Sequence, residues 1–145
     1  LSIVRSFMDK KPEEIVSQRK VSPTGSDEQA TILLKNDLNQ MAVVALSMHS
    51  KQPKRAMISC EKGYIEIMEF PRAEKATIVD AVTGAKTEID CGCTADALRY
   101  ELTDMEQAVS RQNADDMKLA FSRDVMDIMT KIRKDWNMKY PGEDW

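Results

Sequence analysis

The pattern of apolar and polar positions is clearest in residues 63–70, where side chains alternate between two faces. Ile65 and Ile67 share one face, while Glu66 lies on the other. A period of two residues is typical of a β-strand with one buried face. Pro71 ends the strand, because proline cannot donate a hydrogen bond to a sheet. We therefore predict that residues 63–70 form a central strand of an antiparallel sheet.

Six other segments have the composition and length of short strands. They are residues 14–21, 28–34, 40–49, 55–60, 76–81 and 86–91. Most of the turns between them are short and rich in Asn, Asp, Gly and Pro, which favours antiparallel hairpins over helical crossovers. The first segment has a polar face and resembles an edge strand. Residues 40–49 are the most apolar, and we expect them to be buried on both faces in their middle.

The last third of the chain changes to helical spacing. One apolar stripe comprises Ala97, Leu98, Leu102, Met105 and Val109, and a second comprises Val125, Ile128, Met129, Ile132 and Trp136. A polar break over residues 112–116 separates them. Ser122 is the predicted N-cap of the second helix, Asn137 its end, and Asp127 and Lys131 an ion pair one turn apart. Neither helix can bury its stripe alone, so both are expected to cover one face of the sheet.

These patterns predict an α+β fold: an open, predominantly antiparallel β-sheet with the C-terminal helices packed on one face. Residues 1–145 are expected to form a single domain, since a chain of this length can bury a substantial core. The second face of a seven-stranded sheet would stay exposed, and contiguous apolar surface of that size marks an interaction site. That face could serve self-association or form one wall of a ligand cleft.

Composition excludes several classes of protein. Charged residues make up 31% and aromatic residues 6%, the net charge is −3, and there is no basic stripe, so nucleic-acid binding is not expected. The longest mostly apolar run, residues 41–48, is too short to span a membrane. The start of the chain lacks the layout of a signal peptide, which favours a cytoplasmic protein. Residues 1–8 resemble the end of an amphipathic helix, so we expect a piece of a longer protein.

Two of the three cysteines, Cys91 and Cys93, flank a single glycine, and Cys60 stands alone. A zinc site would need further thiolates or imidazoles at ligand spacing, and His49 is the only histidine. A disulfide across one residue would be strained. The pattern therefore favours reduced thiols at a strand end, and no metal ligand is predicted.

No motif in the sequence is typical of a catalytic site. The five glycines are scattered singly, so a phosphate-binding or dinucleotide loop is absent. Glu66 and Glu69 lie on opposite faces of a regular strand, which favours solvated carboxylates over an acid–base pair.

The candidates for substrate contact are Phe70, Arg72 and Tyr100. Arg72 could bind an anionic or hydroxylated ligand at the rim of the sheet, or be an exposed rim charge. Tyr100 could reach the sheet or pack as an ordinary helix residue.

The order and spacing of several segments resemble the C-terminal domain of the Gfo/Idh/MocA family of NAD(P)-dependent oxidoreductases, which includes glucose–fructose oxidoreductase and dihydrodiol-dehydrogenase-like members. The segments are residues 1–5, 27–31, 63–67, 70–73, 97–101, 122–129 with 132–133, and 139–143. Each motif is loose, and together they extend over nearly the whole chain.

The resemblance implies that the parent protein has two domains with different functions. In this family an N-terminal Rossmann domain binds NAD or NADP and carries the catalytic lysine of a Glu-Lys-Pro motif. The sheet domain supplies one wall of the substrate cleft and the subunit contact. Glu61 and Lys62 lie in a turn between strands and do not match that motif, so no catalytic or cofactor-binding residue is carried over to this chain.

The resemblance therefore implies a chain that is inactive alone, with the parent's Rossmann domain and a second copy of itself as partners. The parent would oxidise or reduce a sugar, polyol or diol. The alternative reading is a stand-alone interaction or dimerisation module without a catalytic parent.

Overall fold

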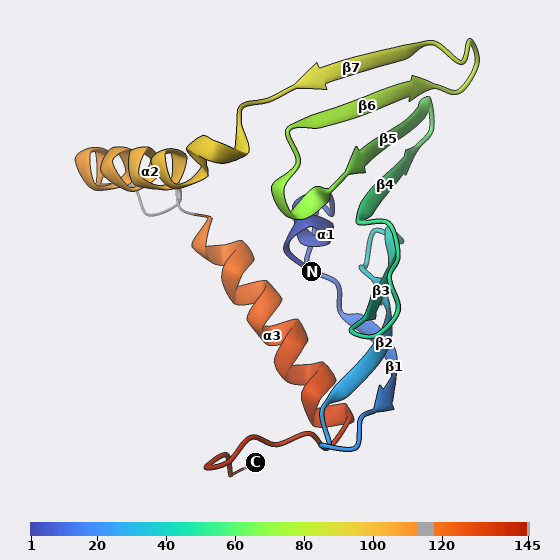
Figure 1. The fold of residues 1–145 in the computed structure, drawn as a ribbon, viewed down its shortest axis with the longest axis vertical. Helices are drawn as coiled ribbons and strands as arrows, with labels where there is room; N and C mark the ends of the chain where they lie inside the picture. Colours follow the sequence, from blue (N-terminus) through green and yellow to red (C-terminus); the bar gives the residue numbers. More distant parts are fainter. Residues whose placement is uncertain (113–117, 145) are drawn as a thin grey trace. The chain divides into compact units, whose positions relative to one another are not determined.

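The structure is a computed structural model that describes residues 1–112 and 118–144. It confirms the α+β class and all seven predicted strands, which are antiparallel throughout (Figure 1). The strands form two open sheets of three and four strands rather than one sheet of seven. The chain divides into a first unit, Leu1–Lys51 with Lys118–Trp145, and a second unit, Gln52–Met117.

The first unit contains the three-stranded sheet and two helices. Its elements are α1 (Ser2–Ser6), β1 (Glu14–Val21), β2 (Asp27–Lys35), β3 (Met41–Ser47) and α3 (Leu119–Asp135). The strand order is β1-β2-β3, so β2 is the central strand and β1 is the edge strand that its polar face predicted. In Figure 1, α3 lies alongside this sheet.

The core of the first unit joins α3 to β2. Ile128 and Ile132, one helical turn apart, pack against Ile32 and Leu34, which alternate along the inner face of β2. All four side chains are at most 3% exposed. Burying a side chain of this size contributes roughly 1.5–3 kcal/mol, and the stripe predicted for the second helix is what meets the sheet.

The prediction that residues 40–49 are buried on both faces is wrong. Strand β3 lies at the edge of its sheet, and Met41 and Val43 on its outer face are 72% and 67% exposed. Val43 pairs with Leu33, which in turn pairs with Val16, so one apolar row crosses the outer face of all three strands. The apolar composition of β3 therefore reflects two apolar faces, of which α3 covers one.

Helix α3 begins earlier than predicted. Its N-cap is Lys118, whose φ of 49° is left-handed, and Ser122 lies inside the helix. Among the described residues, no side-chain hydrogen bond caps this end. The predicted C-terminal boundary is confirmed: Asn137 adopts φ 49°, and the backbone amide of Met138 turns back to the Arg133 carbonyl at 2.9 Å.

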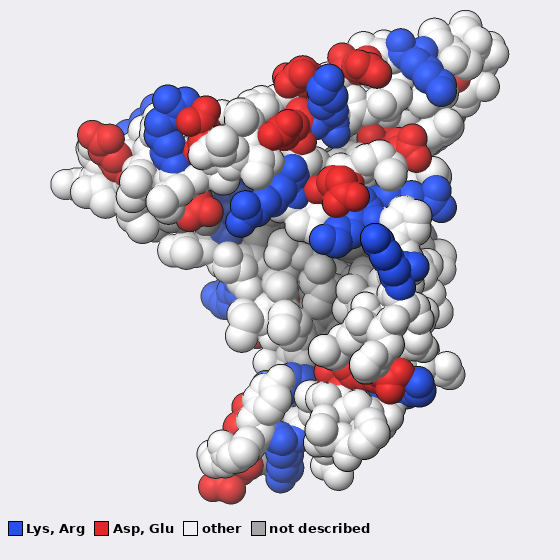
Figure 2. Space-filling view, in the orientation of Figure 1, with Lys and Arg blue, Asp and Glu red and all other residues white. Residues whose placement is uncertain are grey.

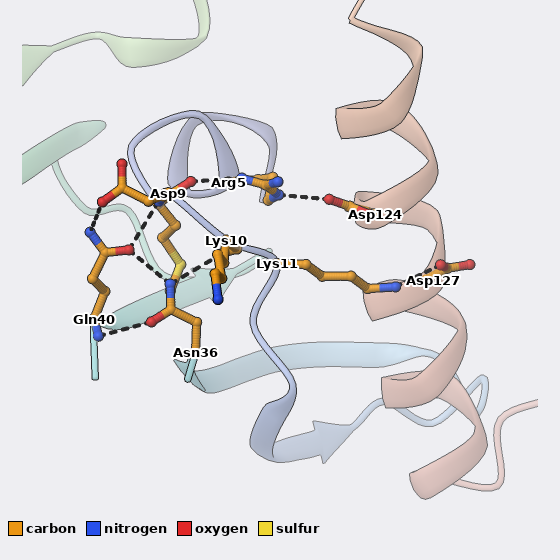
Figure 3. Close-up of polar contacts among 9 residues, drawn as sticks. Arg5, Asp9, Lys10, Lys11, Asn36, Gln40, Asp124 and Asp127 are labelled. Carbon is orange, nitrogen blue, oxygen red and sulfur yellow. Dashed lines mark hydrogen bonds and ion pairs between the residues drawn. The ribbon is translucent and has the colours of Figure 1, made fainter. Parts of the chain in front are cut away.

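Two ion pairs of almost equal length tie α3 to the N-terminal segment (Figure 3). Arg5 Nε lies 2.8 Å from Asp124 Oδ2, and their side chains are only 10% and 14% exposed. Lys11 Nζ lies 2.7 Å from Asp127 Oδ2, with exposures of 39% and 54%. Asp127 therefore pairs across the unit and not with Lys131, which donates instead to the Glu13 carbonyl.

The second unit contains the four-stranded sheet and the elements that follow it. These are β4 (Arg55–Cys60), β5 (Gly63–Met68), η1 (Phe70–Arg72), β6 (Lys75–Asp80), β7 (Lys86–Asp90), η2 (Thr94–Asp96) and α2 (Ala97–Arg111). The order β4-β5-β6-β7 gives β5 a neighbour on each side, which confirms it as a central strand.

The ends of β5 depend on local backbone geometry. At Gly63 an added Cβ would lie 2.0 Å from the Val79 carbonyl oxygen, so only glycine fits there. The strand stops at Met68, two residues before the predicted end, because Glu69 turns to a left-handed φ of 52° and begins η1.

One face of the four-stranded sheet carries a continuous set of apolar side chains. Ile58, Ile65 and Ile78 lie in one row across β4, β5 and β6. Alternation places four further apolar residues on the same face: Ala56, Ile67, Ala76 and Ile89. None of these seven side chains is fully buried. We call this surface the isoleucine face.

Helix α2 packs principally against η2 and leaves its apolar stripe exposed. Leu98, Leu102 and Val109 are each more than 60% exposed, and Ala108 is its buried residue. The expectation that the helices cover a sheet face thus holds for α3.

Most of the polar break predicted for residues 112–116 lies outside the described residues. Across the described part of the chain, no helix has the length and apolarity needed to cross a membrane.

We predict that the burial of the two ion pairs in the first unit, and not their length, determines how much each contributes to the free energy of unfolding. Asp124→Ala should destabilise the protein by about 3 kcal/mol, because it leaves the Arg5 guanidinium buried without its carboxylate. Asp127→Ala removes an equally short but exposed pair and should change the stability little. Urea unfolding of both variants measures the difference, and equal losses would contradict this account.

Candidate functional site

The candidate site is a hollow of about 180 Å³ at one end of the β6–β7 hairpin. Three segments of the second unit line it: the end of η1 with the chain that follows, the chain after β7, and the first turns of α2. The lining residues are Pro71, Arg72, Ala73, Glu74, Cys91, Cys93, Thr94, Ala97 and Tyr100.

Hydrogen bonds across the hairpin end hold the first two segments together. The Cys91 amide donates to the Glu74 carbonyl at 2.8 Å, which extends the pairing of β6 with β7. The Thr94 amide donates to Glu74 Oε1 at 2.7 Å, and the Thr94 hydroxyl donates to the Arg72 carbonyl at 3.1 Å. The hydrogen bond from the Thr94 backbone amide is the largest cause that lowers the pKa of Glu74.

Tyr100 attaches α2 to this framework. Its hydroxyl oxygen accepts a hydrogen bond of 3.2 Å from the Cys93 amide. Gly92 adopts φ 82°, and a Cβ there would lie 3.0 Å from that same oxygen. Glycine is therefore required at this position both for its left-handed backbone and for the close approach of Tyr100.

The structure brings together two of the three residues predicted for substrate contact. Arg72 and Tyr100 line the hollow, and of the two alternatives for Tyr100 the structure shows contact with the chain that follows β7. Phe70 lies in the same 3-10 turn as Arg72 but is not among the lining residues. Among the described residues, the Arg72 guanidinium has no hydrogen-bond or ion-pair partner, so it is available to a ligand.

Sequence reasoning missed that Cys91, Cys93 and Glu74 share this hollow with Arg72. The signal was present, because the predicted hairpin of residues 76–81 with 86–91 places the start of its first strand beside the end of its second. The left-handed turn at Gly92 and the contact with Tyr100 could not be read from the strand pattern.

A second polar cluster, in the first unit, has no free functional groups. Asn36 is 2% exposed, and its side chain accepts from two backbone amides and donates to the Lys10 carbonyl and to Gln40 (Figure 3). Gln40 in turn bonds both the amide and the carboxylate of Asp9. Because Asn36 and Gln40 satisfy one another and the nearby backbone, the cluster's evident role is to stabilise the 36–39 turn.

The carboxylates Glu66 and Glu69 do not form a pair. Glu66 lies on the face opposite Ile65 and faces Met57 and Thr77 on the neighbouring strands. Glu69 is exposed in the left-handed turn before η1. This agrees with the expectation of solvated carboxylates.

The residues that line the hollow carry groups that can bind a ligand. It presents one guanidinium, one phenol and two thiols, and its carboxylate already accepts from Thr94. A guanidinium beside a phenol suits a small anionic or hydroxylated molecule. Acidic and basic side chains are interspersed over the face shown in Figure 2, which has no broad area of one sign.

Comparison with known proteins identifies no family for this chain: no family model matches it, and no curated protein matches it.

We predict that the Thr94 amide proton reports the ionisation of Glu74. A carboxyl whose pKa is lowered in the folded protein keeps its hydrogen bond above its ordinary pKa and loses it as the pH falls through the lowered value. In an NMR titration the Thr94 amide shift should therefore change with a midpoint below the ordinary value for glutamate. Glu74→Gln should abolish that step, whereas Glu88→Gln on β7 should leave it unchanged. A midpoint at or above the ordinary value would contradict the hydrogen-bond network.

Proposed function

We propose that this chain is the sheet domain of an NAD(P)-dependent oxidoreductase of the Gfo/Idh/MocA type. In the parent protein it supplies one wall of the substrate cleft and the subunit interface, and NAD or NADP binds to a separate Rossmann domain. The order and spacing of the segments described above support this assignment. The arrangement of seven antiparallel strands followed by two helices is compatible with it. We place the protein in the cytoplasm, where its three free thiols would stay reduced.

The observation that carries the interface part of the proposal is the isoleucine face. Seven apolar side chains lie on one side of four paired strands, and in the second unit no helix packs principally against them. Water contact with such a surface is unfavourable, and a second copy of the same surface removes it by a two-fold pairing.

The observation that supports the cleft wall is the meeting of Arg72 and Tyr100 in one hollow. Both groups bind hydroxyl or anionic oxygens, which are the groups that a sugar, polyol or diol presents. Glu74, Thr94 and Cys91 hold the backbone around them, and the Cys93 amide holds the Tyr100 hydroxyl, so the loops and the phenol are ordered before a ligand arrives.

The interface prediction is tested with two neighbouring residues of β4. Ile58 lies on the isoleucine face and Met57 on the opposite face. We expect the unmodified chain to elute as a dimer or larger species by light scattering. Ile58→Lys should give monomers, because burying its ammonium at the contact is costly, and Met57→Lys should leave the mass unchanged. A monomeric unmodified chain, or equal effects of both substitutions, would rule out this interface.

The catalytic part of the proposal is tested on the protein that the complete coding sequence specifies. We expect a glycine-rich strand–turn–helix unit and nicotinamide-dependent oxidation of a sugar, polyol or diol. Arg72→Ala should raise KM about tenfold with little change in kcat, because it removes one charged hydrogen bond from ground and transition states alike. Lys86→Ala, which removes an exposed charge at the start of β7 and does not change a residue that lines the hollow, is the control.

Two outcomes would refute parts of this proposal. Absence of both the glycine-rich unit and the activity would favour a stand-alone interaction module. Activity with an unchanged KM in the Arg72 variant would remove Arg72 from the cleft wall and leave the family assignment intact.

A further inference from the structure

The thiols of Cys91 and Cys93 are the groups in the hollow that the proposed function does not use. Both are free and exposed, and both residues line the same small volume. The backbone amide of Cys91 donates to the Glu74 carbonyl, and the backbone amide of Cys93 donates to the Tyr100 hydroxyl. The left-handed turn at Gly92 lies between them. Two free cysteines one residue apart thus line the same hollow, on a loop whose backbone is fixed by hydrogen bonds.

We propose that Cys91 and Cys93 form a two-coordinate site for a single Cu(I) ion. The site is independent of the oxidoreductase assignment, because it uses only groups present in this chain.

The donor set selects the metal. Glu74 is the one carboxylate among the residues that line the hollow, and it already accepts a hydrogen bond from Thr94, so the soft donors there are the two sulfur atoms. Structural zinc sites take four ligands, and Ca²⁺ or Mg²⁺ takes six or more oxygens. Thiolates are soft ligands that favour Cu(I). In the described part of the chain no group of three or more His, Cys, Asp or Glu side chains is placed to hold a metal ion.

The charge of the hollow fits the same ion. Binding replaces the two thiol protons, which leave to solvent, so two thiolates and one Cu⁺ give a complex of net charge −1. The Arg72 guanidinium lines the hollow without a protein partner among the described residues and supplies the compensating +1. A disulfide or a pair of neutral thiols would need no such cation.

The test is a titration of the reduced chain with Cu(I) under anaerobic conditions, in competition with a chromogenic Cu(I) chelator. We expect one Cu(I) per chain and, by copper-edge X-ray absorption, two sulfur neighbours and no nitrogen or oxygen. Affinity should rise with pH, because two protons are released. Zinc added in equal amount should not displace the copper.

Three serine variants and one arginine variant make the test specific. Cys91→Ser and Cys93→Ser should each weaken binding by more than about 100-fold, since even changes beyond the ligands themselves cost 10–100-fold. Arg72→Met should weaken it about tenfold. Cys60→Ser, which changes an exposed thiol on β4, should have no effect. Circular dichroism establishes that each variant is folded.

Four outcomes would overturn the proposal. The first two are Cu(I) binding that persists in each of the separate variants Cys91→Ser and Cys93→Ser, and a ratio of one copper to two chains. The other two are displacement of the copper by zinc, and an affinity of the Arg72→Met variant for Cu(I) equal to that of the unmodified chain.

Discussion

The constraint on which the structure depends is that an apolar sheet face must be covered. In the first unit α3 meets it, because Ile128 and Ile132 bring one helical stripe onto the alternate residues of β2. The polar contacts of this unit follow from that packing. Arg5 reaches Asp124 and stacks 4.5 Å from the centre of the Phe121 ring, and Arg19 on β1 donates to the Trp136 carbonyl at the other end of α3. These bonds orient a helix whose place is determined by the core.

The second unit also contains an antiparallel sheet with an apolar face, but among its described residues no helix packs on that face as α3 does in the first unit. Its isoleucine face is continuous across three strands, while α2 is tied to the end of the hairpin through Tyr100 and η2. A surface of this kind is costly to leave in water, and a partner is the simplest remedy. The hollow beside Arg72 lies in the same unit. In the proposed function, this unit therefore carries both the association surface and the ligand contacts.

Sequence patterns predicted the positions of the strands better than the burial of their faces or the boundaries of the helices. Alternation in residues 63–67 assigned Ile65 and Ile67 to one face correctly, because a strand's period of two is local. The same kind of reasoning failed for β3, since an apolar run does not distinguish a strand buried on both faces from an edge strand with one face open. Residue type favours Ser122 as the N-cap, whereas α3 begins at Leu119 after the N-cap Lys118, a boundary that no local preference marks.

The candidate site was partly predictable for a similar reason. Arg72 and Tyr100 were selected by chemistry and position, and they do meet. Their meeting with Cys91 and Cys93 follows from the hairpin register, in which Lys75 pairs with Asp90. The turn at Gly92 and the Tyr100 contact depend on tertiary packing, which no pattern in the sequence records. The family assignment rests on the order of loose motifs and remains a proposal.

The central claim is that the isoleucine face is the surface through which two copies of this chain associate. Isotope-filtered NMR on a mixture of labelled and unlabelled chains tests it directly, because only contacts between copies give signals. The account predicts intermolecular signals from the methyl groups of Ile58, Ile65 and Ile78. Signals from Val16, Leu33 and Val43 instead, on the outer face of the three-stranded sheet, or no signals between copies at all, would contradict it.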